Sequence, residues 1–370
     1  MFSMMPQKLF SILLLYCGIL CFGQVEPFVD IKDALGRDRW DADCGNQFKA
    51  KHILNLSASY SKIGFTDIYK VAESKSAPRA FNSGTPLNMQ PRDNNKFVKK
   101  IDIGFDFCFF DKKYSQVVIG TNGTVTFDDT LLGSINFPAF SESNPHRQLP
   151  VNSIFGIMQA MEFNASEGSD IYYETVGTAP RRQLIINYYN AKMFYNGINT
   201  ACEDLRSSSQ IVLHEGTNII EVFIDKKPAF CPDSKFPTSL VGIIDSFGKL
   251  GYSPAGRNTG NWQAENEKWA FVPIGQRFFR GLEIQPTIEW FDSSGKRLDN
   301  TSKDVFFNSY QPYFIGIKNP KKNEVITVKL THNICGFNYV VTDEFPINFS
   351  VDHPIPLDIY EVICRPTTVN

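Results

Sequence analysis

The chain contains 370 residues, which is too long for one compact core and predicts two domains. Its 42% hydrophobic and 21% charged residues are ordinary for a folded protein and exclude a disordered one. The formal net charge of −2, with no block of like charges, argues against nucleic-acid binding and against a polybasic membrane patch. The 32 Phe and 14 Tyr residues favour pleated sheets over helical bundles.

Residues 1–23 are predicted to be a signal peptide. Lys8 gives the positive flank, and Leu9–Phe22 gives an apolar core that ends at the small residue Gly23. This core of about 14 residues is shorter than the ~20 residues that span a bilayer, so we expect no membrane span after signal removal. An uncleaved N-terminal anchor is the alternative. Residues 24–43 are charged and weakly patterned, and a loose N-terminal segment is expected there.

Six cysteines follow the signal peptide, and an even number in an exported chain predicts disulfides. Cys202 and Cys231 bracket one hydrophobic hairpin and are expected to pair. Six cysteines allow fifteen sets of pairings, so the connectivity stays open. The expected set of three bridges is Cys202–Cys231, Cys335–Cys364 and Cys44–Cys108.

The segment Gln116–Phe127 predicts a β-hairpin, because two β-branched runs flank the pair Asn122-Gly123. A two-residue type I′ turn needs positive φ at both central positions, and Asn and Gly adopt it readily. That turn would place Val118 opposite Phe127. Gly120 would leave a gap on the inner face that a neighbouring aromatic ring can fill.

Short runs of alternating or continuous apolar residues predict strands on both sides of this hairpin. No stretch has a sustained helical period, so helix content should be low. Residues 44–282 are therefore predicted to form a large β-sandwich, with an ordered loop at Glu73–Asn95. The expected strands are Lys100–Phe110, Ser153–Met161, Asp170–Glu174, Gln183–Tyr189, Ser209–His214, Asn218–Ile224 and Leu240–Asp245.

Residues 283–370 are predicted to form a second, small immunoglobulin-like sandwich around Trp290. The fold class expected for the whole chain is thus all-β. The expected strands of this domain are Thr287–Phe291, Tyr313–Ile317, Val325–Leu330 and Phe337–Thr342.

No arrangement of residues in the sequence matches a catalytic, cofactor or metal motif, and we expect no enzyme activity. His214-Glu215 begins like a zinc-protease motif, but no second His follows one helical turn later. Ser253 lies in a glycine-rich segment, but Pro254 is unsuited to the helix that a nucleophile elbow must open.

Two sets of residues, one acidic and one aromatic, are candidate binding sites. The acids are more often solvated than bound to calcium, and aromatics in a Phe-rich sandwich are more often core than a carbohydrate platform. The acids are Asp128, Asp129, Glu162 and Asp170. The aromatics are Trp262, Trp269, Phe194 and Tyr195. Glycosylation triplets begin at Asn55, Asn122, Asn164, Asn300 and Asn348.

Several stretches, taken in their order along the chain, resemble the nidogen-like repeat of large secreted surface proteins of Bacteroidetes. They span about Cys44–Pro273, and the run Ala255–Phe271 is the most specific. The resemblance implies an adhesin-like protein, related to gliding-associated, type IX-secreted proteins. It also implies that the second domain is an immunoglobulin- or PKD-like module, and it carries no catalytic residue. The other stretches are Phe105–Phe110, Val117–Gly123, Ser153–Gly156, Ser209–Leu213 and Asn218–Val222.

The segment from Arg257 to Phe271 is predicted to be a structural lid on the large sandwich. Glycines permit tight turns in it, and Trp262 and Trp269 can pin an irregular loop to the sheet. Arg257 is expected to hydrogen-bond loop carbonyls or a carboxylate.

The sequence as a whole predicts a secreted or cell-surface, disulfide-bonded adhesin or scaffold. It would bind an extracellular protein or glycan through loops on a rigid sandwich. A carbohydrate-binding or glycan-processing protein is the alternative, and it would need two converging carboxylates such as Glu162 and Asp170. A truncated, inactive copy of a longer adhesin is a third possibility.

Overall fold

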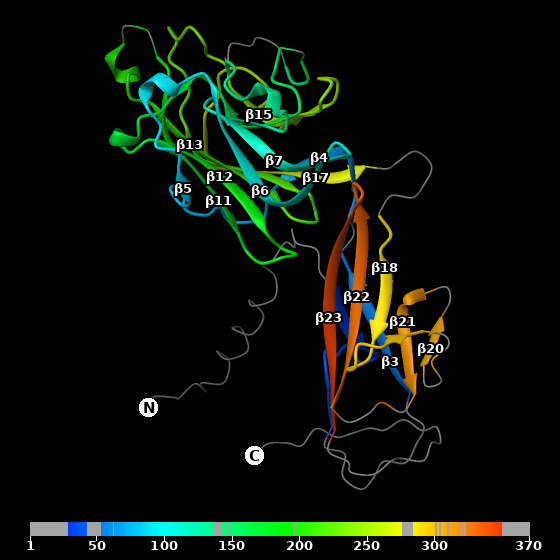
Figure 1. Ribbon diagram of the computed structural model, residues 1–370. Coiled ribbons are helices and arrows are strands. Elements are labelled where there is room, and N and C mark those ends of the chain that lie inside the picture. Colours follow the sequence, from blue (N-terminus) through cyan, green and yellow to red (C-terminus); the bar gives the residue numbers. More distant parts are fainter. Residues whose placement is uncertain are drawn as a thin grey trace, which may run out of the picture.

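The computed structural model describes residues 29–42, 53–61, 63–136, 143–146, 148–195, 197, 199–275, 284–299, 302, 305–308, 311–318, 320 and 323–349. The predicted signal peptide, Cys44 and Cys364 lie outside these residues. The protein is all-β, as expected, and its described helices are short 3₁₀ turns. Four sheets form two sandwiches that lie end to end (Figure 1). The 3₁₀ turns are η2 (Pro91–Asp93), η3 (Asp129–Leu131), η4 (Ala165–Glu167) and η5 (Thr200–Cys202).

The larger sandwich stacks an eight-stranded sheet on a six-stranded sheet. The eight-stranded sheet has the order β4 (Phe65–Glu73), β17 (Ala264–Gly275), β14 (Ile220–Lys227), β13 (Arg206–His214), β12 (Gln183–Met193), β11 (Asp170–Val176) and β5 (Thr85–Pro86), with β10 (Met161–Glu162) beside β12. The six-stranded sheet has the order β16 (Gly251–Tyr252), β15 (Leu240–Ile244), β9 (Ser153–Met158), β8 (Thr124–Thr126), β7 (Lys112–Gly120) and β6 (Phe97–Phe109).

The core of the larger sandwich lies between these two sheets. The alternating residues of β6, from Ile101 to Phe107, all point into it, as the sequence pattern predicts. Tyr188 on β12 packs against the same core, and its hydroxyl donates to the carbonyls of Gly120 and Thr124, each at 3.0 Å. The long β6 is therefore held by side-chain burial along its whole inner face.

The Asn-Gly hairpin forms, but its predicted register is wrong by one residue. Val118 pairs with Thr126 and not with Phe127, so the loop contains three residues, of which only Gly123 has positive φ. This is the three-residue hairpin whose last loop residue is left-handed. The inner face therefore carries Ile119 and not Val118. The gap at Gly120 is filled by the Asn136 side-chain amide and, as expected, by an aromatic ring, that of Phe97.

The smaller sandwich stacks a four-stranded sheet on a five-stranded sheet around Trp290. The four-stranded sheet has the order β1 (Val29–Asp33), β3 (Ile53–Tyr60), β21 (Gln311–Lys318) and β20 (Val305–Asn308). The five-stranded sheet has the order β19 (Arg297–Leu298), β18 (Thr287–Phe291), β22 (Glu324–Ile334), β23 (Phe337–Phe349) and β2 (Trp40–Ala42).

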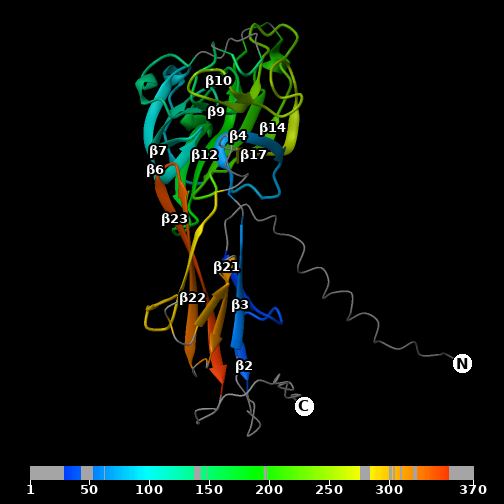
Figure 2. The ribbon, with the colours of Figure 1, turned by 90° about the vertical axis from the view of Figure 1, so that its right-hand side faces the viewer.

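The predicted domain boundaries are wrong at the N-terminal side. Residues expected to be a loose lead form β1 and β2, and β3 belongs to the smaller sandwich although it was expected in the larger one. Val29 and Ile31 of β1 are buried in the core of the smaller sandwich. The five residues of β1 alternate but are too few to establish a period, and β2 pairs with β23, which lies far along the chain. The smaller sandwich is thus built from both ends of the described chain, and the larger one is inserted between them (Figure 2).

Candidate functional site

The two sandwiches meet where the tip of the β22–β23 hairpin reaches the larger sandwich (Figure 1). The Tyr339 hydroxyl on β23 donates to the carbonyl of Pro180 at 2.6 Å. Its ring lies over Gly216 in the β13–β14 turn, where a Cβ would be only 2.1 Å from the ring. Only glycine fits that approach.

A disulfide between Cys108 and Cys335 joins the same two parts of the chain. Cys108 is the next-to-last residue of β6, and Cys335 is in the turn between β22 and β23. The backbone N–H of Cys108 donates to Asn218 Oδ1 at 2.7 Å, which fixes the strand end. The expected Cys335–Cys364 and Cys44–Cys108 bridges are therefore wrong, because the hairpin folds back onto the larger sandwich and brings Cys335 to Cys108.

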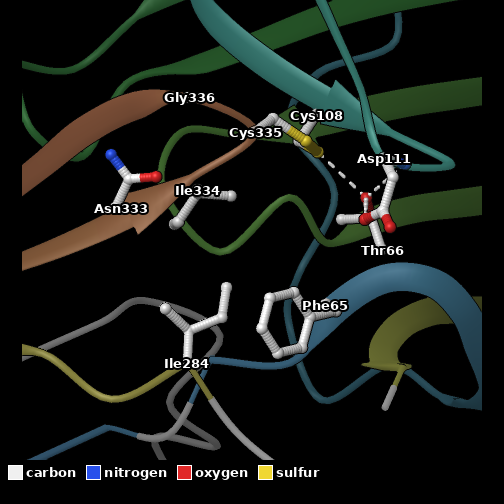
Figure 3. Close-up of a pocket in the computed structure, with 9 residues that line it drawn as sticks. All are labelled: Phe65, Thr66, Cys108, Asp111, Ile284, Asn333, Ile334, Cys335 and Gly336. Carbon is white, nitrogen blue, oxygen red and sulfur yellow. Dashed lines mark hydrogen bonds between the residues drawn. A yellow bond between two sulfur atoms is a disulfide. The ribbon is translucent and has the colours of Figure 1, made fainter. Parts of the chain in front are cut away.

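A cavity of about 320 Å³ lies beside this disulfide (Figure 3). Thr66 Oγ1 lies 2.9 Å from Cys108 Sγ and accepts a hydrogen bond from the Asp111 N–H at 2.8 Å. Phe65 and Ile284 line the apolar side. Cys108, Asp111 and Cys335 are close enough together to hold a metal ion, but both sulfurs are bonded to each other and offer no thiolate. The cavity is best described as part of a cross-linked junction.

The second disulfide, Cys202–Cys231, forms as expected and lies at the opposite end of the larger sandwich. The β13–β14 turn faces the smaller sandwich, so the β12–β13 and β14–β15 connections lie at the far end of these antiparallel strands. We call residues 194–205 and 228–239 the distal loops. The disulfide links one distal loop to the other.

Aromatic side chains gather on the distal loops. The rings of Phe194 and Phe236 lie 6.2 Å apart. The Tyr195 hydroxyl donates to Asp233 Oδ2 at 2.5 Å and accepts from the Asn199 N–H at 2.8 Å. These contacts order both loops across the disulfide. All three aromatic side chains are partly exposed.

The predicted lid is partly wrong. Trp269 lies on β17, a strand inside the eight-stranded sheet, so only residues 254–263 form a loop. The prediction was wrong because the polar and charged residues Glu265–Lys268 are typical of a solvated loop. In the structure they lie on a strand that has a partly exposed face.

Within the shorter lid, Arg257 has the expected carboxylate partner. Its guanidinium donates to Glu267 and stacks over Trp262 at 4.8 Å. Burial raises the pKa of Glu267, but hydrogen bonds from Arg257 and Trp269 outweigh it and lower that pKa overall. The Trp262 indole donates to Ser239 O at 3.0 Å, so Arg257 and Trp262 hold the loop down, whereas the predicted anchor Trp269 lies on the strand that follows.

Lys227, which the sequence analysis did not single out, is buried under the lid. Its ammonium lies 4.4 Å from the Trp262 ring centroid and 4.8 Å from that of Phe230, and donates to the carbonyl of Pro228 at 3.1 Å. Burial, together with the charge of Arg257, lowers the pKa of Lys227 to about 7. Nothing in the sequence marks such a lysine at the end of an interior strand, because its burial depends on the lid that folds over it.

A buried polar chain at Ser74, Glu221 and His214 was also missed. The Ser74 hydroxyl donates to Glu221 Oε1 at 2.5 Å, and His214 Nε2 lies 2.7 Å from Glu221 Oε2. The carboxylate stands between the serine and the histidine, whereas nucleophilic catalysis needs the histidine between them. The chain therefore holds strands together and does not activate the serine.

Asn122 is also a structural residue and is fully buried. Its Oδ1 accepts from the Met161 N–H at 2.9 Å, and its Nδ2 donates to Asn95 Oδ1 at 2.8 Å. A glycan at this triplet is incompatible with the fold, unlike at Asn55, which is exposed.

The predicted acids do not converge. The Asp170 carboxylate is buried and accepts three backbone N–H groups, from Asn88, Met89 and Ile171. Asp128 caps η3, and Asp129 pairs with Lys100 at 2.9 Å. Glu162 instead lines a separate polar pocket.

An all-β fold with two disulfide bonds is typical of extracellular proteins. The model of the NIDO-related family matches residues 68–275, more than half of the chain, so the protein belongs to the NIDO-related family. No match was found among curated proteins or among solved structures. The family and the two disulfides are compatible with an extracellular location. Among the described residues, no helix has the length and apolar composition needed to cross a bilayer.

Proposed function

We propose that the protein is an exported adhesin or scaffold without enzymatic activity, and that it binds an extracellular protein or glycan through its distal loops. The observation that carries this proposal is the Cys202–Cys231 bridge across two aromatic loops, at the end away from the junction. A covalent link lowers the conformational entropy that loops lose on binding. Partly exposed aromatic side chains are the residues that most often supply binding energy at interfaces.

The smaller sandwich acts in this proposal as a spacer of fixed direction. The Cys108–Cys335 bridge and the Tyr339 hydrogen bond to Pro180 hold it against the larger sandwich. A fixed spacer presents the distal loops away from whatever carries the opposite end. The narrower relationship to gliding-associated, type IX-secreted Bacteroidetes proteins, with an immunoglobulin- or PKD-like smaller module, belongs to the same proposal and is supported by the sequence resemblance.

The test is a binding screen of the mature chain against matrix proteins and glycans, followed by a pair of matched variants. Phe236→Ser removes one aromatic contact of the distal loops. Phe247→Ser removes an aromatic side chain that is 72% exposed and lies beside Lys112, at the junction end. We expect Phe236→Ser to weaken binding by tenfold or more and Phe247→Ser to leave it unchanged. Equal binding by both variants, or no binding to any surface component, would refute the proposal.

The glycan-processing alternative has less support. Its acid pair is not formed by Glu162 and Asp170, because Asp170 is occupied by backbone N–H groups. Release of sugar from a panel of glycosides by the mature chain would reinstate it.

A further inference from the structure

A small polar pocket lies beside the 3₁₀ turn η4, where β10 and β13 flank β12. Figure 2 shows β10 in the half of the larger sandwich that lies away from the smaller one. The pocket has a volume of about 180 Å³. Its charged lining residues are Glu162, Glu167, Lys192 and Arg206.

One of the residues that line this pocket is a buried serine whose hydroxyl has no hydrogen-bond partner among the described residues. Ser169 lines it, is 1% exposed, and its Oγ has no partner among the described residues. A buried hydroxyl without a partner destabilises a fold by about 1–3 kcal/mol. A ligand oxygen in the pocket would supply the missing hydrogen bond.

Two opposite charges also lie here without pairing. Glu162 and Lys192 are directly opposite each other on β10 and β12. Both line the pocket, and neither makes a side-chain hydrogen bond or ion pair within the described part of the chain. An acceptor and a donor are therefore available side by side.

The other two charges are already partly engaged. Glu167 accepts from Asn164 Nδ2 at 2.8 Å and lies 3.8 Å from Arg206. Arg206 also donates to Asp204 at 2.7 Å. These contacts fix the rim of the pocket and leave Glu162, Lys192 and Ser169 to meet a ligand.

The chemistry of the lining selects a class of ligand. Two carboxylates and two cations balance, so neither a free metal cation nor a free anion is favoured. A ligand whose groups both donate and accept can satisfy Glu162, Lys192 and Ser169 together, and a sugar hydroxyl does this. We propose that the pocket binds one neutral saccharide unit. This goes beyond the proposed function, because none of the distal-loop aromatics lines the pocket.

The test uses saturation-transfer NMR with neutral hexoses and N-acetylhexosamines on the full mature chain. The protein is made in a bacterial periplasm, so Asn164 carries no glycan. Calcium and inorganic phosphate serve as charged probes. Ser169→Ala should weaken saccharide binding roughly 2- to 10-fold, and Glu162→Gln roughly 10- to 100-fold.

A matched control separates binding from folding. Ser209 is also 1% exposed with an unpartnered hydroxyl, but it does not line the pocket. Ser169→Ala and Ser209→Ala should both keep or raise stability, since each removes an unsatisfied group. Only Ser169→Ala should lose saccharide.

Three outcomes would overturn the inference. They are no saccharide binding, binding that Ser169→Ala leaves unchanged, and displacement of the saccharide by calcium or phosphate. Adhesion that depends on Phe236 would stand in each case, so the two proposals fail separately.

Discussion

Gly123 ends the hairpin loop in a position that no other residue can occupy. Its φ is +71°, and a Cβ would lie only 1.9 Å from the carbonyl oxygen of Ile157. We expect Gly123→Ala to lower the free energy of unfolding by at least about 3 kcal/mol, because the strand must move to relieve the contact. Denaturant unfolding measures it.

Gly256 is the matched control for that substitution. Its φ is +72°, but nothing lies within 4 Å of the added Cβ. Gly256→Ala should therefore show only the left-handed backbone penalty of about 1 kcal/mol. Similar losses in both variants would mean that the contact with Ile157 does not matter.

His332 makes the smaller sandwich sensitive to acid. Neither ring nitrogen has a hydrogen-bond partner in the described chain, and burial lowers the pKa to about 4 from about 6.5. The unfolded state therefore binds the proton more tightly than the folded state. The contribution of neutral His332 to the free energy of unfolding is fully present above pH 6.5. It is lost as the pH drops towards 4, by about 3 kcal/mol in total.

The measurement is the unfolding free energy against pH for the native chain and for His332→Leu. The difference in slope between pH 6.5 and pH 4 isolates this histidine from the carboxylates that titrate nearby. Parallel pH curves would show that His332 is not the group responsible.

At this scale the sequence predicts turn chemistry better than side-chain roles. Asn122-Gly123 marks the hairpin correctly, but the pattern cannot separate a two-residue loop from a three-residue one. The loop length is decided by the burial of the Asn122 amide against Met161 and Asn95, which come from distant segments. Ser169 gives no signal at all, since its importance depends on the pocket around it.

Among the elements, strand β17 and the lid illustrate what alternation can and cannot show. Apolar alternation identified β6 and β22 because one face of each is buried. In β17 the buried residues are interrupted by charged ones, so the sequence pattern predicts a loop there. Pairing partners are harder still, because β3 pairs with β21 across most of the chain.

The short lid should depend on its ion pair. Arg257→Met removes the hydrogen bonds to Glu267, while the lid backbone still accepts from the Val241 N–H at 2.8 Å. We expect roughly tenfold faster amide exchange in residues 254–263 and unchanged exchange in β13. Hydrogen–deuterium exchange with mass spectrometry measures this.

The control is Arg297→Met, which removes a 59% exposed arginine paired with Glu289 in the smaller sandwich. It should leave the lid unchanged, because exposed pairs contribute little. Unaltered exchange of the lid in Arg257→Met would show that the other contacts of the lid hold it without the ion pair.

For the whole molecule, the Cys108–Cys335 bridge should keep the two sandwiches in contact and make them unfold together. It closes a loop of 227 residues. The chain-entropy model gives about 5 kcal/mol for that closure, against about 4 kcal/mol for Cys202–Cys231. Replacing Cys108 and Cys335 with serine should split thermal unfolding into two transitions and increase the radius of gyration by X-ray scattering.

Replacing Cys202 and Cys231 with serine is the comparison. That variant should keep the radius of gyration, because its bridge lies within one sandwich. An unchanged radius in both variants would mean that Tyr339 and the packed hairpin suffice at the junction. The sequence predicted the local bridge and not the distant one, because nearness along the chain says nothing about a hairpin that folds back.

The interrupted smaller sandwich dictates an order of assembly. As the polypeptide leaves the ribosome, β1 and β3 appear first, but the neighbour of β3, strand β21, is made only after the entire larger sandwich. The early strands must wait as unfinished edges, which are prone to self-association. A nascent chain stopped after residue 275 would hold a completed NIDO-related core and three strands of an unfinished sandwich, β1, β2 and β3, and factors that shield these strands would be needed until β18 to β23 are made.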